Sequence, residues 1–324
     1  MRIIFAGTPE PAVVALEKLI ASEHEVIAVI TRPDARRGRG RTLHPSPVAV
    51  AAEKHGIEIL KPKSLKLDTT DGQALYQRLT ELQPAAIPVV AYGNLIPTKF
   101  LELPEHGWIN LHFSLLPAWR GASPVQWAIH NGDKYTGATT FRIDEGLDTG
   151  LILQTLKTEI QPTDTSDDLL SRLAYSGADL LVETLDHLAA GTATFLPQEG
   201  QATYAPKIST ADARIDWTQS AQQIDQAIRA FSPGPGAWTL WEEQRVKIGP
   251  VGILTTDPNN ESSVVLPAAS APGTVHIGKN EVLVSTGSGQ WLKLGQIQPP
   301  GKKMMAAADW ARGLHDNAKD VTFQ

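Results

Sequence analysis

The sequence predicts an α/β fold in which a mostly parallel sheet with helices is followed by a smaller, β-rich region. In the first half, short apolar runs rich in branched residues alternate with helical patterns, which is typical of a parallel sheet. From residue 219 onward, a helix precedes short runs broken by turn residues, which favours a small barrel or sandwich. A chain of 324 residues is long enough to form two domains with separate cores.

The apolar runs of the first half each predict one element. We expect strands at residues 2–6, 25–31, 57–60, 85–91, 108–113, 137–143 and 151–160. We expect helices at residues 12–21, 48–55, 72–82 and, as a long amphipathic pattern, 165–189. A further helix should begin near Ser123, after an irregular loop that Pro117 and Gly121 impose and that exposes backbone groups.

Two consequences follow for the predicted sheet. Pro88 lacks the N–H that a ladder needs, so we expect disturbed pairing around it. Ligands of parallel sheets bind beyond the carboxyl ends of the strands. The loops that begin at Gly7, Arg32, Tyr92 and Ser114 should therefore face one crevice.

The second half has a different organisation. Residues 191–208 are rich in Gly, Thr, Gln and Pro and lack periodicity, which predicts a linker between a domain over 1–190 and one over 209–324. In the latter we expect a helix at 221–231 and strands at 237–241, 244–254, 273–277, 281–286 and 291–298. Its 10 Lys and Arg residues nearly balance 11 Asp and Glu residues, so it carries no strong electrostatic footprint.

Composition excludes several classes of function. The chain has no cysteine, which rules out disulfides, thiolate nucleophiles and iron–sulfur clusters. Its net charge of −6 argues against a protein that coats polyanions indiscriminately. No signal peptide and no apolar run of about 20 residues is visible, so we expect a cytoplasmic protein without a membrane partner.

One segment departs from the acidic average. Residues 32–41 (RPDARRGRGR) carry five arginines against one acid, with two glycines interleaved. A solvated surface loop explains this composition, and so does a phosphate-contacting loop, because arginine matches phosphate oxygens and glycine lets the backbone approach them.

The first strand is followed by a turn, FAGTP over residues 5–9, where a helix N-terminus could meet an anion. The spacing G-x-G-x-x-G is absent, which argues against a nicotinamide or flavin enzyme built on this turn. A strand-to-helix turn is the simpler explanation for Gly7.

Asn110, His112 and Ser114 alternate along a predicted strand, so their side chains should share one face. Three polar groups at the carboxyl end of a buried strand need partners, and a substrate is the simplest one. Asp148 lies in the turn-rich segment RIDEGLDTG and is the best candidate to fix the tautomer of His112 and support its charge. Asp144 and Glu145 in the same segment are explained by turn formation.

Several motifs together resemble the methionyl-tRNA formyltransferase family. They are FAGTPEPAV, TRPDARRGRGRTLHPSPV, VVAYGNLIP, NLHFSLLPAWRGASPVQWAI, DEGLDTGLIL, YAPKI, FSPGPGAW and PPGKKMMAAADWARG. The resemblance spans nearly the whole chain. The pattern N-x-H-x-SLLP with a downstream G-x-D-x-G is shared by folate-dependent formyltransferases. The arginine segment and the carboxyl-terminal motifs point to the tRNA enzymes.

The resemblance implies a Rossmann-like formyltransferase domain followed by an OB-like β-barrel. It also implies transfer of a formyl group from 10-formyltetrahydrofolate to the α-amino group of initiator methionyl-tRNA, by direct amine attack and without a metal. Asn110, His112 and Asp148 match the catalytic trio. In this chemistry Asn110 and His112 would donate hydrogen bonds to the tetrahedral oxyanion, with Asp148 orienting His112. The folate would lie against Tyr92, Gly93, Ser114, Leu115, Leu116 and Pro117.

The same resemblance implies a tRNA path. The loop over residues 32–47 would meet the acceptor end, whose unpaired nucleotides can be drawn into the site. The implied contacts are Arg36, Arg37, Arg39, Arg41, Lys207, Lys302 and Lys303. Ala85 and Pro88 depart from the family pattern, as does Ala118, where many relatives carry a basic residue. We expect the protein to act as a monomer.

Two alternatives remain open. A folate-dependent formyltransferase acting on a sugar amine or another small amine, such as glycinamide ribonucleotide, predicts the same trio but no tRNA loop. The glycinamide enzyme also predicts no second domain. The second alternative is an RNA-binding module with an inactive formyltransferase domain, and the intact trio argues against it.

Overall fold

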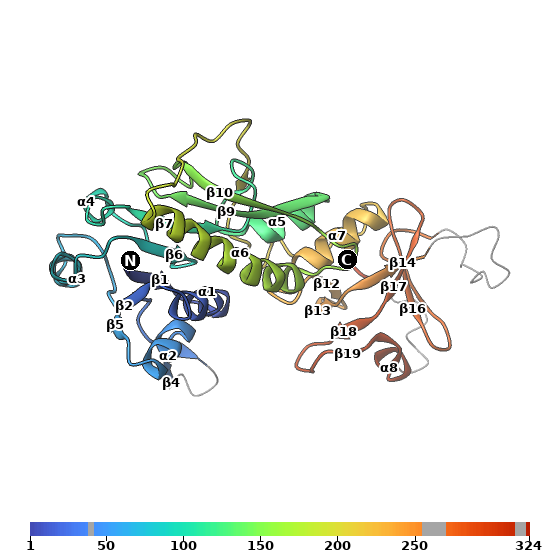
Figure 1. Ribbon diagram of the computed structural model, residues 1–324. Coiled ribbons are helices and arrows are strands. Elements are labelled where there is room, and N and C mark those ends of the chain that lie inside the picture. Colours follow the sequence, from blue (N-terminus) through green and yellow to red (C-terminus); the bar gives the residue numbers. More distant parts are fainter. Residues whose placement is uncertain (38–41, 255–269, 315–321) are drawn as a thin grey trace. The chain divides into compact units, whose positions relative to one another are not determined.

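The computed structural model describes residues 1–37, 42–254, 270–314 and 322–324, which form two compact units (Figure 1). The first unit consists of Met1–Pro124, Tyr135–Glu159 and Leu170–Ala205. The second consists of Val125–Lys134, Ile160–Leu169 and Pro206–Gln324. The expected boundaries at 190 and 209 remain a prediction.

The first unit is built on a seven-stranded sheet in the order β10-β9-β7-β6-β1-β2-β5. Its strands are β1 (Arg2–Gly7), β2 (Glu25–Ile30), β5 (Glu58–Leu60), β6 (Ile87–Val90), β7 (Trp108–His112), β9 (Tyr135–Arg142) and β10 (Ile152–Glu159). The first five of these run parallel, whereas β9 pairs antiparallel with both β7 and β10. The α/β fold with a mostly parallel sheet is therefore confirmed.

Pro88 disturbs the sheet on one side only. Along β7, the pairing of β6 is continuous from Ile87 to Val89. Along β1, the ladder holds Ala6 against Val89, while Ile3 and Ala86 form an isolated bridge. The missing N–H of Pro88 accounts for this gap, and the strand stays central because its other edge is fully paired.

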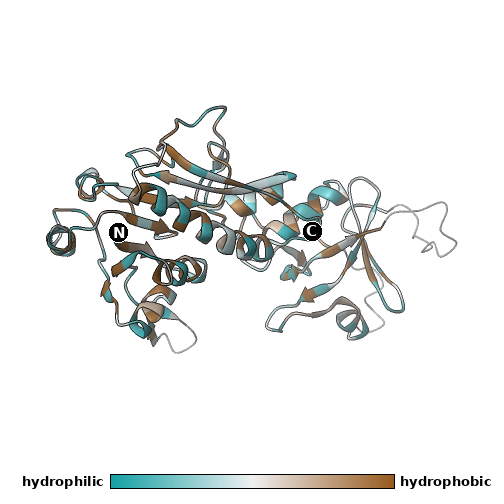
Figure 2. Cartoon of the chain, in the orientation of Figure 1, coloured by the Kyte–Doolittle hydropathy of each residue, from teal (hydrophilic) through white to brown (hydrophobic). Residues whose placement is uncertain are grey.

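Helices begin where the sequence supplies caps or prolines. In the first unit they are α1 (Glu10–Ile20), α2 (Pro47–Lys54), α3 (Thr70–Leu82), α4 (Thr98–Leu101) and most of α6 (Ser166–Ala189). The Ser46 and Thr69 side chains accept backbone N–H groups at the starts of α2 and α3. Figure 2 shows the inner strands of the sheet as largely hydrophobic, and Ile3, Ile4, Phe5 and Ile30 are fully buried there. This rigid core carries the loops at the carboxyl ends of the strands.

Two short pairings add elements that periodicity does not reveal. Strand β3 (Ala35–Arg37) in the arginine segment pairs antiparallel with β4 (Thr42–His44), which follows it. Strands β8 (Arg120–Gly121) and β11 (Tyr204–Ala205) pair parallel. The expected linker thus contributes a strand to the first unit.

The second unit is β-rich, as expected, and contains two four-stranded sheets. Helices α5 (Pro124–Asn131), α7 (Ala221–Ala230) and α8 (Ala307–Arg312) accompany them. One sheet joins β12 (Trp238–Trp241), β13 (Gln244–Ile248), β18 (Gln296–Gln298) and β19 (Met305–Ala306). The other joins β14 (Val251–Ile253), β17 (Trp291–Leu294), β16 (Val282–Ser285) and β15 (Val275–Ile277). The small antiparallel sheets are consistent with a barrel-like domain.

Candidate active site

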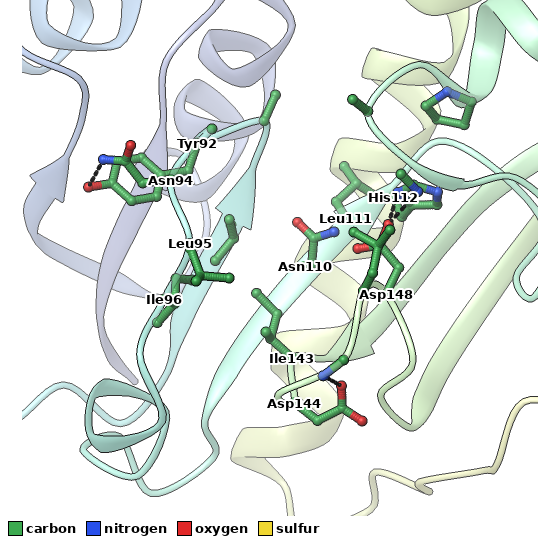
Figure 3. A pocket seen from close by; sticks show the side chains of 18 of the residues that line it. Tyr92, Asn94, Leu95, Ile96, Asn110, Leu111, His112, Ile143, Asp144 and Asp148 are labelled. Carbon is green, nitrogen blue, oxygen red and sulfur yellow. Dashed lines mark hydrogen bonds and ion pairs between the residues drawn. The ribbon is translucent and has the colours of Figure 1, made fainter. Parts of the chain in front are cut away.

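A cavity of about 630 Å³ opens at the carboxyl ends of β6 and β7 in the first unit (Figure 3). Its lining residues come from three places: the loop that follows β6, the end of β7 with the segment near Gly121, and the turn between β9 and β10. Asn110, His112 and Asp148 all line it. A crevice is therefore present at the carboxyl ends of the strands. The loops that begin at Tyr92 and Ser114 line it, but no described residue of the loops that begin at Gly7 and Arg32 does.

His112 ends β7 with its side chain only 7% exposed. Its Nε2 lies 2.9 Å from the carbonyl oxygen of Trp119. A carbonyl only accepts, so Nε2 carries the proton and Nδ1 is the other, facing nitrogen. Burial lowers the pKa of His112 below 6.5, while the Asp148 charge and the Trp119 carbonyl oppose that shift. His112 is thus a neutral imidazole at pH 7 that presents a lone pair on Nδ1.

Asp148 faces that lone pair. Its Oδ2 lies 3.8 Å from His112 Nδ1 and accepts the backbone N–H of Gly121 at 2.7 Å. The distance to His112 exceeds that of a hydrogen bond, so Asp148 acts on the imidazole through its charge. The tautomer of His112, which the sequence assigned to Asp148, is set instead by the Trp119 carbonyl.

Asn110 lies on the same face of β7 as His112, as strand alternation predicts. In Figure 3 its side-chain amide projects between the β6 loop and His112. Across the part of the chain that the structure describes, no hydrogen bond engages that amide, and Asn110 is only half-buried. Its N–H groups are available to a ligand.

Three residues in or next to the cavity have a strained backbone. Ala91, Trp119 and Asp148 have φ values of 47°, 60° and 52°, in the left-handed region that non-glycine residues rarely adopt. Ala91 and Asp148 line the cavity, and Trp119 holds His112. Strain of this kind concentrates where surrounding structure fixes a functional geometry.

The N-terminal turn and the arginine segment act on this site indirectly. Gly7 and Arg32 do not line the cavity. Thr8 Oγ1 donates to the Tyr92 carbonyl, and Arg32 donates to the Gly93 carbonyl, at 3.0 and 2.9 Å. These loops therefore support the β6 loop. Gly7 itself serves close packing, because a Cβ there would lie 2.7 Å from the Phe5 ring.

Comparison with known proteins identifies the family. Residues 1–185 match the model of the formyl transferase family, and residues 207–315 match that of the formyl transferase C-terminal domain. The methionyl-tRNA formyltransferase of Corynebacterium aurimucosum is 65% identical over 322 residues, covering 99% of this chain and 97% of the relative. The chain belongs to the methionyl-tRNA formyltransferase family. A second member, from Corynebacterium efficiens, is 64% identical and covers 97% and 98% of the two chains.

Solved structures share the fold of this methionyl-tRNA formyltransferase family member. One is a sugar 3-N-formyltransferase crystallised in the presence of dTDP and 5-N-formyl-THF, with a TM-score of 0.67 and 19% identity. The alignment covers 94% of this chain and 99% of that one. At this identity, the likeness concerns the fold alone.

The residues expected at the folate divide into two groups. Tyr92 and Gly93 line the cavity, and Tyr92 is 2% exposed, with burial raising the pKa of its phenol. Residues 114–117 do not line it. The Ser114 hydroxyl donates to the Ala118 carbonyl and is fully buried, so it braces the loop instead of facing a ligand.

The residues expected at tRNA lie in both units. Arg36 is exposed on β3, beside Arg37 in the same strand, whereas Arg39 and Arg41 lie outside the described residues. Lys207, Lys302 and Lys303 are exposed in the second unit. Arg36 therefore presents its charge to solvent, as a phosphate contact requires.

Asp144 forms the turn expected of it, since its Oδ1 accepts from the N–H of Gly146 and the hydroxyl of Thr149.

Two groups that hold the trio, the Trp119 carbonyl and the Gly121 N–H, belong to the backbone. The sequence reveals only that Pro117 and Gly121 impose an irregular loop there. Within residues 1–37, 42–254, 270–314 and 322–324, no cluster of three metal-ligating side chains occurs, and no helix is long and apolar enough to span a membrane.

The protonation state of His112 is directly measurable. We expect ¹⁵N NMR at pH 7 to show a protonated Nε2 and an unprotonated Nδ1, with protonation of the ring only as pH falls through a value below 6.5. Asp148→Asn should lower that pKa further, because the carboxylate charge raises it. Titration above 6.5, or a proton resident on Nδ1 at pH 7, would contradict this assignment.

Proposed function

We propose that this protein transfers a formyl group from 10-formyltetrahydrofolate to the α-amino group of initiator methionyl-tRNA. The observation that carries the proposal is 65% identity, over 99% of this chain, to a relative named methionyl-tRNA formyltransferase. In this proposal the protein acts as a cytoplasmic monomer. The purified protein, given both substrates, should release N-formylmethionine after deacylation of the tRNA.

The proposed reaction joins the amine nitrogen to the formyl carbon. Attack by the neutral amine gives a tetrahedral oxyanion, and collapse breaks the bond from the formyl carbon to N10 of the folate. The amine loses one proton and N10 gains one, so the products are N-formylmethionyl-tRNA and tetrahydrofolate. Amine attack on a formamide requires no metal for this balance.

His112 is suited to move that proton. Its Nδ1 lone pair can accept the proton of the attacking amine, because Nε2–H is committed to the Trp119 carbonyl. Once protonated, Nδ1–H can donate to the oxyanion or pass the proton to N10. The nearby Asp148 carboxylate stabilises the imidazolium in the interval. The resemblance implies that His112 donates a hydrogen bond to the oxyanion. In this scheme His112 does so only after it has accepted the proton of the amine.

Asn110 is the proposed donor to the oxyanion from the outset. Its amide is half-buried at the cavity and lies on the same strand face as His112. A donor aimed at developing charge in a site with little water stabilises the transition state more than the substrate. We assign the folate to the wall formed by Tyr92 and Gly93, within a cavity whose volume of about 630 Å³ is ordinary for a small-molecule site.

The tRNA assignment rests on the arginine segment and on the exposed lysines. Changing Arg37, Arg39 and Arg41 to alanine should raise KM for methionyl-tRNA and leave kcat nearly unchanged. If each contacts one phosphate of a single strand, the slope of log affinity against log salt should become shallower by about 2. The same triple change at the exposed residues Lys63, Lys66 and Lys99 is the control. Equal salt slopes for both variants would remove the arginine segment from the tRNA path.

A further inference from the structure

Gln198 makes four hydrogen bonds although it lies in the segment expected to be a linker. Its Oε1 accepts from Nε and Nη2 of Arg120 at 3.1 and 2.6 Å. Its Nε2 donates to the carbonyl oxygens of Asp148 and Gly150 at 2.7 and 3.0 Å. The side-chain amide therefore uses both N–H groups and both lone pairs.

These bonds join the two segments that meet at His112. Arg120 lies between Trp119, whose carbonyl fixes the His112 tautomer, and Gly121, whose N–H binds the Asp148 carboxylate. Asp148 and Gly150 belong to the turn between β9 and β10. Gln198 thus ties the backbone that holds His112 to the backbone that carries Asp148.

The turn needs such support. Asp148 has a φ of 52°, which costs a non-glycine residue free energy. Gly150 packs so closely that an added Cβ would meet the Arg142 carbonyl oxygen at 1.7 Å. A small rotation of the backbone at Asp148 would move its carboxylate away from His112 Nδ1 and from the Gly121 N–H. Contacts on both sides of the turn must therefore hold this backbone in place.

We propose that Gln198 is a positioning residue that holds the Asp148 carboxylate against His112 for formyl transfer. The inference rests on the proposed function, because it takes Asp148 and His112 as the reacting pair. Thr203 assists from the same segment, since its Oγ1 accepts the Trp119 N–H at 2.8 Å while β11 pairs with β8. Gln198, Thr203 and strand β11 therefore belong to the active-site scaffold.

The chemistry of the contact distinguishes glutamine from glutamate. Gln198→Glu keeps the size and the pairing with Arg120, but it places lone pairs against the carbonyl oxygens of Asp148 and Gly150. Gln198→Ala removes both the acceptor for Arg120 and the donor to the two carbonyl oxygens. Gln201→Glu adds the same charge at an exposed position nearby and is the matched control.

The test measures kinetics and one spectroscopic signal on the full-length protein. We expect both Gln198 variants to lower kcat about 10- to 100-fold with KM for methionyl-tRNA nearly unchanged, as a small misplacement of a reacting group does. The amide resonance of Gly121, which reports its bond to the Asp148 carboxylate, should move in both. Gln201→Glu should change neither, and melting temperatures identify any variant that does not fold.

Wild-type kcat in both Gln198 variants, or an unmoved Gly121 resonance, overturns the proposal. If Gln198→Ala does not fold, Gln198→Glu decides, because it keeps the Arg120 pairing. The Gly121 resonance can be measured even if the protein has no formyltransferase activity. A wild-type protein that fails to formylate methionyl-tRNA therefore refutes the proposed function, while the Gly121 signal still tests whether Gln198 holds Asp148.

Discussion

Replacing His112 by alanine should lower the rate constant of formyl transfer by about 10²- to 10⁴-fold, the usual contribution of a positioned acid–base group. The imidazole is buried at the cavity with Nδ1 facing Asp148, and it is neutral near pH 7. Its removal leaves only water to accept the amine proton, and no imidazolium forms beside the Asp148 carboxylate during the reaction. Single-turnover kinetics at saturating tRNA measure this loss without interference from product release.

The matched control is His106→Ala, a histidine of the same unit that does not line the cavity. We expect it to keep wild-type rates. A His112→Ala protein that folds and transfers formyl within tenfold of the wild type would remove His112 from the chemistry.

Asn110→Ala should lower kcat by about 10²- to 10³-fold, the typical effect of losing one oxyanion donor. Asn110→Asp should be at least as damaging, because a carboxylate of the same size cannot donate and repels the developing negative charge. Comparing the two variants separates the effect of hydrogen-bond donation by Asn110 from the effect of its size. Both variants should retain the melting temperature of the wild type, since the structure shows the amide half-buried at the cavity.

The opposite order, with Asn110→Asp active and Asn110→Ala inactive, would mean that Asn110 fills space or accepts a hydrogen bond. Steady-state kcat and KM for both substrates decide between these outcomes. A loss confined to KM for the folate would place Asn110 in donor binding and not in stabilisation of the transition state.

Local patterns predicted the parallel sheet because each of its strands carries its own run of apolar residues. The predicted strand at 244–254 shows the limit of that approach. It forms two strands, β13 and β14, in different sheets, with Gly249 and Pro250 between them. The residues between were apolar enough to continue the pattern, but proline cannot supply a ladder N–H there.

In the site, too, residues within one strand could be predicted from local pattern, whereas contacts outside the strand could not. Alternation placed Asn110 and His112 correctly because both lie within β7. Ser114 falls beyond the end of that strand and does not line the cavity, and its hydroxyl donates to the Ala118 carbonyl. The Trp119 carbonyl could not be predicted, because an irregular loop positions it. Gln198 could not be predicted, because it contacts the backbone of Asp148 from a segment far away in the sequence.

In the proposed function, this cavity is the place where the amine of methionyl-tRNA is formylated. The most direct measurement is a competition assay, in which one limiting pool of formyl-labelled 10-formyltetrahydrofolate is offered initiator methionyl-tRNA and a nucleotide-linked amino sugar together. We expect the label to be recovered on methionine attached to tRNA. Recovery of the label on the sugar amine, with none on the tRNA, would contradict the assignment of substrate.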